Sequence, residues 1–423
     1  MTAAGKFRRS ILLFMSASLL FLDASAARAG ATSTTVWHVT QGGAGSRDGA
    51  SWANAFGEAD FPAAVVSAGP GGEFWVARGA YRPAIPGNAA SVTEAERQKS
   101  FVLKSGVAIY GGFAGTEASS TDRNPIANVT VLTGDLARDD ARDANGVTAT
   151  SDDIVGSNSC HVVVGSGTDA SAVLDGLVVT AGNADDNGGG MYANTGNPTV
   201  VGCTFSGNST KGLGGGVYAC GGSTPTVTDC IFSGNNAIAG GGMYNDVGCN
   251  STVTNCTFSA NNASGGGGMC NVNGSPAVTD CTFSDNRAIL FGGGMMNAGG
   301  GPAPSITNCT FSGNSAGSVG GFGGGMYNIG IVPTLMNCTF SGNNAYSGGG
   351  MYNTMSEPTV TNCIFWDASG GEIYNDSSSP DISFCIVANK DVGTGGASSD
   401  IISADPLLGP LAWNGGPTRT HAL

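Results

Sequence analysis

Positive charge is what this sequence lacks most. Only 11% of its 423 residues are charged, with 17 Lys and Arg against 31 Asp and Glu. The formal net charge of -14 repels nucleic acids and other polyanions, so the composition excludes a nucleic-acid partner. Histidine is scarcer still. The three residues, His38, His161 and His421, lie far apart, which argues against a zinc site.

Long apolar runs are missing beyond residue 22. The run at residues 11–22 is too short to span a bilayer. It follows Lys6, Arg8 and Arg9 and precedes the small-residue sequences ASA and ARA at residues 24–29. This pattern predicts an export signal over residues 1–29, and with it an extracellular, cell-surface or outer-membrane location. No transmembrane segment is expected in the mature chain.

Glycine is present in excess, with 71 residues, and it recurs in a cassette. The absence of a G-X-Y period excludes collagen. Instead the motif GGGMYN alternates with NCTFSGN, in steps of 26, 26, 26, 26, 31, 25 and 22 residues. The glycine motif starts at Gly188, Gly214, Gly240, Gly266, Gly292, Gly323 and Gly348, and a degenerate copy starts at Gly370. Such a period is typical of a solenoid.

One unit indicates which solenoid. Val227 begins an alternation of apolar residues that Asp229 interrupts, after which Cys230 and Phe232 lie two apart on one face. The interrupting position carries only residue types that tolerate a left-handed backbone. Its occupants are Gly202, Asp229, Asn255, Asp280, Asn308, Asn337 and Asn362. We therefore expect a bend there between two short strands.

The glycine cassette supplies a third strand. Its apolar column is formed by Met191, Val217, Met243, Met269, Met295, Met326, Met351 and Ile373. Three short strands per coil predict an all-β fold, a parallel β-helix of roughly 10–12 coils. One coil buries too few side chains to offset the entropy of ordering it. Stacking of coils in register must therefore provide the stability.

These patterns divide the chain into consecutive segments. They are the export signal (1–29), an N-terminal cap and first coil (30–99), irregular early coils (100–187), regular coils (188–390) and a turn-rich tail (391–423). The cap is expected to hold a short amphipathic helix at residues 61–68 and a strand at 74–77. Such a cap covers strand edges that would otherwise invite aggregation.

The repeats resemble those of bacterial right-handed parallel β-helix proteins, in particular the polymorphic outer membrane protein repeat of chlamydial type. Its GGA(I/L) and FxxN signatures correspond here to GGGM and to the runs that begin at Phe205, Phe232, Phe258, Phe283, Phe311 and Phe340. The DPLLGPL and NGGPTRTHAL runs are similar to those of secreted β-helix proteins. The resemblance implies a right-handed, pectate-lyase-like solenoid. It is specific for the fold and not for an activity.

Cysteine occupies one equivalent position in eight coils, at Cys203, Cys230, Cys256, Cys281, Cys309, Cys338, Cys363 and Cys385. Strands about 4.8 Å apart leave parallel Cβ atoms farther apart than a disulfide prefers. We therefore expect a column of buried thiols that act as small apolar groups. Cys220 and Cys249 follow the glycine strand in neighbouring coils. In an exported protein, a disulfide between them is as plausible as two free thiols.

Six tyrosines point outward if the methionine column points inward. They are Tyr192, Tyr218, Tyr244, Tyr327, Tyr352 and Tyr374. Exposed, they could bind a sugar chain or another protein. Alternatively, they cover one another along the stack of coils, which the regular spacing favours.

The densest acidic group is interleaved with Arg138 and Arg142. It consists of Asp135, Asp139, Asp140 and Asp143. Carboxylate oxygens at this density suit calcium, the one cofactor that the sequence suggests. An exposed loop whose charges neutralise one another would hold no ion. This second interpretation is favoured because acidic runs are nonspecific.

Two functions from different classes fit the sequence. A secreted or surface-displayed scaffold, with adhesion as the leading hypothesis, would bind an extracellular polysaccharide or a surface protein of a host or neighbouring cell. A polysaccharide lyase or glycoside hydrolase would need a basic residue or paired carboxylates. The regular coils hold just three basic residues, Lys211, Arg287 and Lys390. We therefore expect a non-catalytic scaffold, and place the alternative enzyme site between residues 83 and 153.

Overall fold

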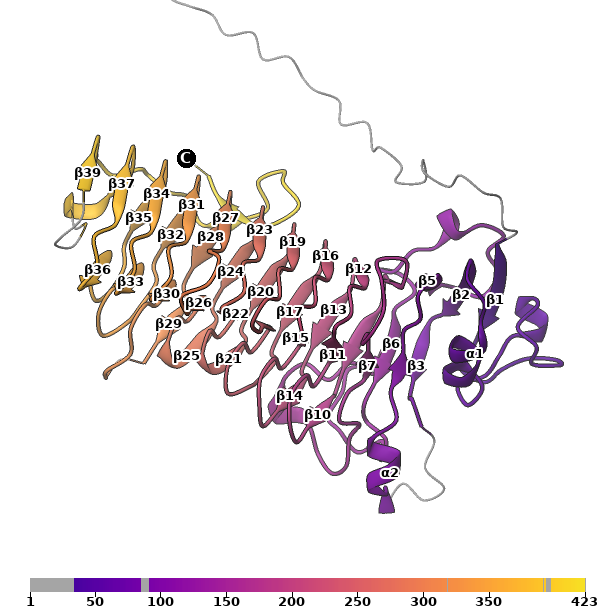
Figure 1. Ribbon diagram of the computed structural model, residues 1–423. Helices are drawn as coiled ribbons and strands as arrows, with labels where there is room; N and C mark the ends of the chain where they lie inside the picture. Colours follow the sequence, from indigo (N-terminus) through magenta and orange to yellow (C-terminus); the bar gives the residue numbers. More distant parts are fainter. Residues whose placement is uncertain (1–33, 85–90, 318, 391, 393–396, 423) are drawn as a thin grey trace, which may run out of the picture. The chain divides into compact units, whose positions relative to one another are not determined.

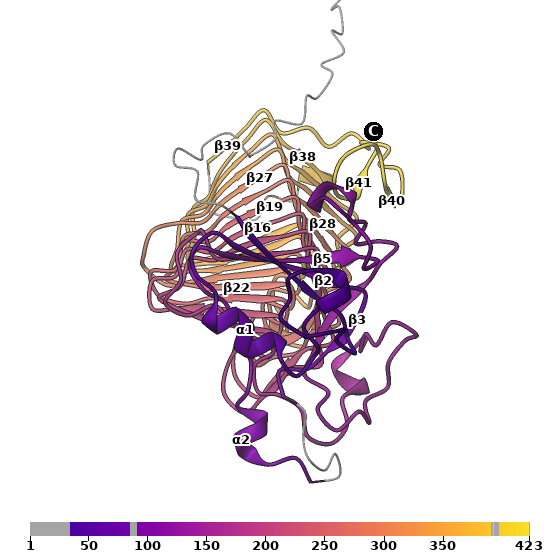
Figure 2. The ribbon, with the colours of Figure 1, turned by 90° about the vertical axis from the view of Figure 1, so that its right-hand side faces the viewer.

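Three parallel sheets run side by side along the chain, and each regular coil adds one short strand to each sheet (Figure 1). The computed structural model describes residues 34–84, 91–317, 319–390, 392 and 397–422, so the predicted export signal lies outside the described residues. Figure 2, seen roughly along the stack, shows successive coils superposed around one core. The predicted all-β parallel β-helix is confirmed.

Sheet 1 contains the strands that precede the predicted bend in the regular coils, such as Thr-Val-Thr in β16 and β19. Its 13 strands are β1 (Thr35–Val39), β2 (Gly72–Ala77), β5 (Val107–Phe113), β8 (Val173–Asp175), β12 (Thr199–Val201), β16 (Thr226–Thr228), β19 (Thr252–Thr254), β23 (Ala277–Thr279), β27 (Ser305–Thr307), β31 (Thr334–Met336), β34 (Thr359–Thr361), β37 (Asp381–Ser383) and β39 (Ala397–Ser399). Strand β39 carries this sheet beyond residue 390, where the regular coils were expected to end.

Sheet 2 contains the Thr-Phe-Ser strands. Its 11 strands are β3 (Gly79–Tyr81), β6 (Thr130–Thr133), β9 (Val178–Thr180), β13 (Thr204–Ser206), β17 (Ile231–Ser233), β20 (Thr257–Ser259), β24 (Thr282–Ser284), β28 (Thr310–Ser312), β32 (Thr339–Ser341), β35 (Ile364–Trp366) and β38 (Ile386–Val387).

Sheet 3 contains the glycine cassettes. Its 10 strands are β4 (Phe101–Val102), β7 (Val163–Val164), β11 (Met191–Asn194), β15 (Val217–Cys220), β18 (Met243–Asn245), β22 (Met269–Val272), β26 (Met295–Ala298), β30 (Met326–Ile329), β33 (Met351–Thr354) and β36 (Ile373–Asp376). Two smaller sheets lie at the turns: β10 (Asn183–Ala184) with β14 (Ser209–Thr210), and β21 (Asn262–Gly265) with β25 (Arg287–Phe291) and β29 (Ser315–Ala316). The C-terminal segment forms an antiparallel pair, β40 (Leu411–Ala412) and β41 (Thr420–His421).

The corner between sheets 1 and 2 is the predicted bend. All seven occupants have a left-handed backbone, with φ between 53° at Asn362 and 58° at Gly202. Gly, Asn and Asp adopt this conformation at the least cost, and in the next coil Phe384, with φ 55°, takes the same position before Cys385. The corner turns the chain sharply and lets both flanking strands direct their apolar side chains inward.

The core consists of columns of like residues. The phenylalanines of sheet 2 are fully buried from Phe205 to Phe365, and neighbouring rings stack with centroids 4.5 to 5.1 Å apart. The methionines of the inward column of sheet 3, from Met191 to Met351, are also fully buried. All eight cysteines of the predicted column are buried free thiols, which confirms that prediction. The Cys230 N–H, for example, lies 3.4 Å from the Cys256 sulfur in the next coil.

Buried asparagines close each coil after the phenylalanine strand. The side-chain amide of Asn261 donates to the Phe232 carbonyl and to Oδ1 of Asn286, each at 2.9 Å. Its own Oδ1 accepts from the backbone N–H and the side chain of Asn235. This ladder links the turns of successive coils and satisfies polar groups that no water reaches.

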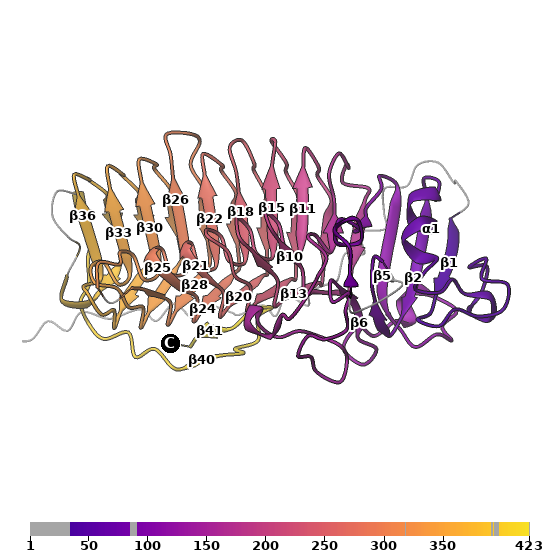
Figure 3. The ribbon, with the colours of Figure 1, turned by 90° about the horizontal axis from the view of Figure 1, so that it is seen from below.

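The two ends of the described chain depart from the regular repeat. Helix α1 (Phe61–Ser67) packs Phe61 and Val65 into the core, as the sequence predicted for the cap. Helix α2 (Glu94–Arg97) lies near the end of the predicted cap segment. After β39, the chain turns back along the outer face of sheet 2 and ends in the β40–β41 hairpin (Figure 3). Among the described residues, no helix is long and apolar enough to cross a membrane.

Candidate functional site

The tyrosine column considered as a binding face is largely covered. Tyr218, Tyr244 and Tyr327 are each 6% exposed. Ring centroids along the column are 5.6 Å apart between Tyr218 and Tyr244, and 5.5 Å apart between Tyr327 and Tyr352. The structure corrects the exposed interpretation, because neighbouring rings cover one another in two runs that Cys270 and Met296 separate.

A second layer of side chains covers this ladder. The turns that precede the glycine cassettes bring Phe291 next to Tyr327 and Phe322 next to Tyr352. The ring centroids of each pair are 4.8 Å apart. Alternation along the strand predicts only that the tyrosines point away from the main core, not that a turn covers them. Tyr192 is half-buried, and Tyr374, on the last strand of sheet 3, is 47% exposed.

Cys220 and Cys249 are both buried and unbonded, so the structure does not contain the disulfide considered above. Ala219 pairs with Asn245, which places Cys220 level with Asp246 rather than with Cys249. The Cys220 sulfur lies 3.8 Å from the Tyr192 hydroxyl, within the tyrosine ladder. Cys220 and Cys249 follow their glycine strands at offsets that look comparable in sequence, but the strand register does not place them opposite each other.

Three of the four candidate calcium ligands converge. Single carboxylate oxygens of Asp135, Asp139 and Asp140 lie within 4.8 Å of one another. Asp143 does not join them. Its Oδ1 accepts hydrogen bonds from the N–H groups of Asn145 and Val147, at 2.8 and 2.9 Å, and so caps its own turn.

The two buried carboxylates of this group already have protein partners. Asp135 accepts from the Asp139 N–H at 3.1 Å and forms an ion pair with Arg142. Asp140 accepts from the Val155 N–H and from the Asn158 amide, each at 2.7 Å. The Arg142 guanidinium supplies the positive charge that an ion would otherwise bring. The geometry therefore fits a self-neutralised loop better than a calcium site.

Burial changes the chemistry of Asp140. Loss of solvent raises its pKa to about 6, although the hydrogen bonds from Val155 and Asn158 oppose the shift. A carboxyl group of this kind can serve as a general acid. Asp140 is only 6% exposed, however, so its proton is shielded from any polymer at the surface.

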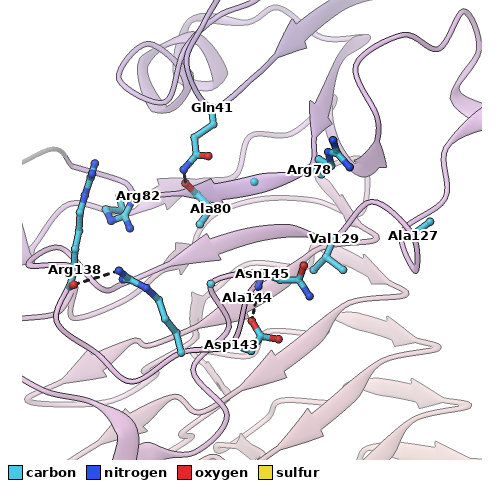
Figure 4. Close-up of a pocket in the computed structure, with 13 residues that line it drawn as sticks. Gln41, Arg78, Ala80, Arg82, Ala127, Val129, Arg138, Asp143, Ala144 and Asn145 are labelled. Carbon is cyan, nitrogen blue, oxygen red and sulfur yellow. Dashed lines mark hydrogen bonds between the residues drawn. The ribbon is translucent and has the colours of Figure 1, made fainter.

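A pocket of about 560 Å³ opens beside this loop, a size typical of ligand sites. Figure 4 shows Arg78 on one side and Arg138 on the other, with Gln41 between them. Arg142 also lines the pocket. Gln41 is fixed because its amide donates to the Ala80 carbonyl at 2.9 Å. The lining combines residues of the cap with residues of the early coils.

The arginines of this pocket differ in what they bind. Arg82 is 6% exposed, and it donates to the Asp135 carbonyl at 2.8 Å and pairs with Glu58 at 2.9 Å. Arg138 is 54% exposed and meets Glu58 only at 3.9 Å. The Arg78 side chain has no hydrogen bond or ion pair with any described residue. The Arg82 pair thus builds the wall, while Arg78 and Arg138 keep donors for a ligand.

This pocket was not foreseen from the sequence. The sequence places the alternative enzyme site between residues 83 and 153. Arg78 lies before that range and directly follows strand β2. No local motif links Arg78 to Arg138. Only the stacking of the cap on the early coils brings the two guanidinium groups to one pocket.

Comparisons with known proteins concern the fold. A family model described as a right handed beta helix region matches residues 140–311. No curated protein matches the chain. Among solved structures, pectate lyase Pel9A is similar with a TM-score of 0.42 and 13% identity, over 86% of this chain and 79% of that one.

Two further solved structures are similar at lower scores. The A-module of mannuronan C-5 epimerase AlgE4 from Azotobacter vinelandii has a TM-score of 0.34 and 12% identity, over 80% of this chain and 93% of that one. Endo-xylogalacturonan hydrolase from Aspergillus tubingensis has a TM-score of 0.24 and 13% identity, over 86% and 99%. Identities this low carry no information on activity. The described coils thus form a parallel β-helix, and residues 140–311 within them are similar to the right handed beta helix region.

Proposed function

We propose that this protein is a non-catalytic β-helix scaffold that binds an acidic polysaccharide through the arginine pocket. The observation that carries the proposal is the pair of available guanidinium groups, Arg78 and Arg138, in a chain of net charge -14. The net negative charge repels polyanions at long range, but this pocket is locally cationic and therefore favours an anionic group that enters it. Guanidinium groups bind carboxylates through two parallel hydrogen bonds, which suits uronic acid units.

Export and adhesion complete this proposal. The signal predicted at residues 1–29 would deliver the scaffold to the cell surface or the medium. The repeats resemble the chlamydial-type polymorphic outer membrane protein repeat, which supports a surface role. The ligand would then be an extracellular polysaccharide of the matrix or of a neighbouring cell.

Calorimetric titration with oligogalacturonate tests the proposal, with a neutral oligoglucan as the ligand control. Arg78→Ala and Arg138→Ala should each weaken binding about tenfold, because a hydrogen bond to a charged group contributes roughly 1.5–3 kcal/mol. Lys211→Ala is the matched control, since Lys211 is an exposed cation that pairs with Asp185 away from the pocket. Equal binding by all three variants, or no binding of the carboxylated ligand, would overturn the proposal.

A polysaccharide lyase or glycoside hydrolase is the second candidate. The observation behind it is the place of the three converging carboxylates beside the pocket, since Arg142 both pairs with Asp135 and lines the pocket. Incubation with acidic polysaccharides, with and without calcium, would reveal unsaturated products or new reducing ends. Turnover that is lost in the Asp139→Ala, Asp140→Ala double variant would establish the enzyme and exclude the non-catalytic scaffold.

A further inference from the structure

A second groove lies where the C-terminal segment crosses the outer face of sheet 2. It has a volume of about 400 Å³. One wall is formed by β17, β20 and the corners that precede them, and the other by Trp413, Pro417 and Arg419. Figure 3 shows the β40–β41 hairpin beside the middle strands of this sheet. The groove is remote in sequence from the arginine pocket and shares no lining residue with it.

The second wall is fixed to the first. The Thr418 hydroxyl donates to the Asp280 carbonyl at 3.0 Å, and the Arg419 guanidinium donates to the Ser284 hydroxyl at 3.0 Å. His421 Nε2 lies 3.1 Å from the Ser312 hydroxyl. These contacts span neighbouring coils, so Trp413 is held on one side of a preformed groove.

Apolar side chains gather at this groove. Trp413 is 67% exposed, and Ile231 on the facing strand is 44% exposed. From β13 to β32 the equivalent position is threonine in the other coils: Thr204, Thr257, Thr282, Thr310 and Thr339. Isoleucine returns only in the last two coils of the sheet, at Ile364 and Ile386. Two large apolar side chains that are exposed to solvent and line the same groove are typical of a binding site.

The polar groups of the corner are also unusual at this groove. In the coils that follow the groove toward the C-terminus, the corner side chains form hydrogen bonds with one another. Asn308 donates to Asp280 at 3.0 Å, and Asn337 donates to Asn308 at 3.0 Å. The side chains of Asp229 and Asn255, which line the groove, form no hydrogen bond with any described residue. The ladder is thus unpaired at the same coils where the groove lies.

We propose that this groove binds a neutral sugar unit of an oligosaccharide, which stacks on Trp413 and bonds through its hydroxyls to Asp229, Asn255 and Arg419. A sugar hydroxyl both donates and accepts. The carboxylate accepts, the guanidinium donates and the amide does both. One face of a pyranose ring is apolar and fits an indole. The opposite charges of Asp229 and Arg419 favour a ligand without net charge. This inference does not rest on the proposed function of the arginine pocket.

Titration of the full chain with cellohexaose, xylohexaose and mannohexaose tests the proposal. Binding of at least one should change the tryptophan fluorescence. Trp413→Ala should abolish that change and weaken calorimetric binding about tenfold, which corresponds to about 1.4 kcal/mol. Ile231→Thr installs the residue of the neighbouring coils, so it should keep the fold and still weaken binding.

Two controls separate the outcomes. Tyr346→Ala removes another exposed aromatic ring outside the groove and should bind as the unaltered protein does. Arg78→Ala should bind the neutral hexamers normally, whatever it does to oligogalacturonate. The proposal is overturned if no neutral hexamer binds, if Trp413→Ala and Tyr346→Ala bind equally, or if Trp413→Ala affects acidic oligosaccharides alone.

Discussion

The phenyl rings of Phe232 and Phe258 lie with their centroids 4.5 Å apart and their planes within 2° of parallel. They belong to neighbouring coils and pair directly in the register of β17 and β20. Like residues from successive cassettes therefore touch, and the sequence repeat becomes a column in space.

Phe258→Ala should destabilise the helix by about 3–5 kcal/mol, because it opens a cavity in a fully packed column. Urea unfolding monitored by circular dichroism measures the loss. Thr257→Ala changes the adjacent residue, which lies on the outer face, and should cost less than about 1 kcal/mol. Similar losses for the two variants would contradict an inward phenylalanine column.

Asn261→Leu should also be destabilising, by about 1–3 kcal/mol for each buried polar group that it leaves unpaired. The Phe232 carbonyl and the Asn235 N–H both lose their side-chain partner. Asn262→Leu is the matched control, since Asn262 is exposed and bonds to Asn236 on the outside. Thermal unfolding should separate the two variants clearly, and a control as damaging as Asn261→Leu would refute the inner ladder.

Removing the Glu58 carboxylate should leave Arg82 buried and unpaired, so Glu58→Ala should cost about 3–5 kcal/mol. It should also weaken oligogalacturonate binding, because Arg82 and Glu58 hold the pocket wall. Glu94→Ala breaks an exposed pair with Arg97 and should change stability by less than about 1 kcal/mol. Chemical denaturation and calorimetry check both effects. A stable Glu58→Ala protein would mean that the pair does not hold the wall.

Burial raises the pKa of Cys203 to about 12 from an ordinary value of 9.0. The unfolded chain therefore releases this proton at a lower pH than the folded chain. Stability from this group is intact below pH 9 and falls as the pH rises from 9 toward 12, by about 1.4 kcal/mol per pH unit. Denaturation of the unaltered protein and of Cys203→Ala at pH 8 and pH 10.5 measures the difference. An equal pH dependence would disprove the buried thiol.

Thiol labelling provides an independent check on the cysteine column. At pH 9 a thiol of pKa 12 is ionised in only about one molecule in a thousand. Maleimide should therefore modify Cys203 far more slowly in the native protein than in the urea-unfolded protein. Rapid labelling of the native protein would show that the column is open to solvent.

Much of this protein follows from the order of its residues. The interval between GGGM motifs predicts coils, and the Gly, Asn and Asp residues at one position predict a left-handed corner, because few other side chains tolerate that backbone. The spacing of Cys230 and Phe232 predicts an inward face, since alternate residues of a strand share a side. Each of these inferences depends on local geometry that repeats from coil to coil.

Only the tertiary structure decided which surfaces remain open. Alternation directs Tyr327 outward, yet Phe291 from a neighbouring turn covers it, and no sequence pattern specifies that contact. The arginine pocket and the Trp413 groove likewise join segments that are far apart in the chain. Strand periodicity fixes the direction of a side chain, whereas the path of the turns and the tail fixes what covers it.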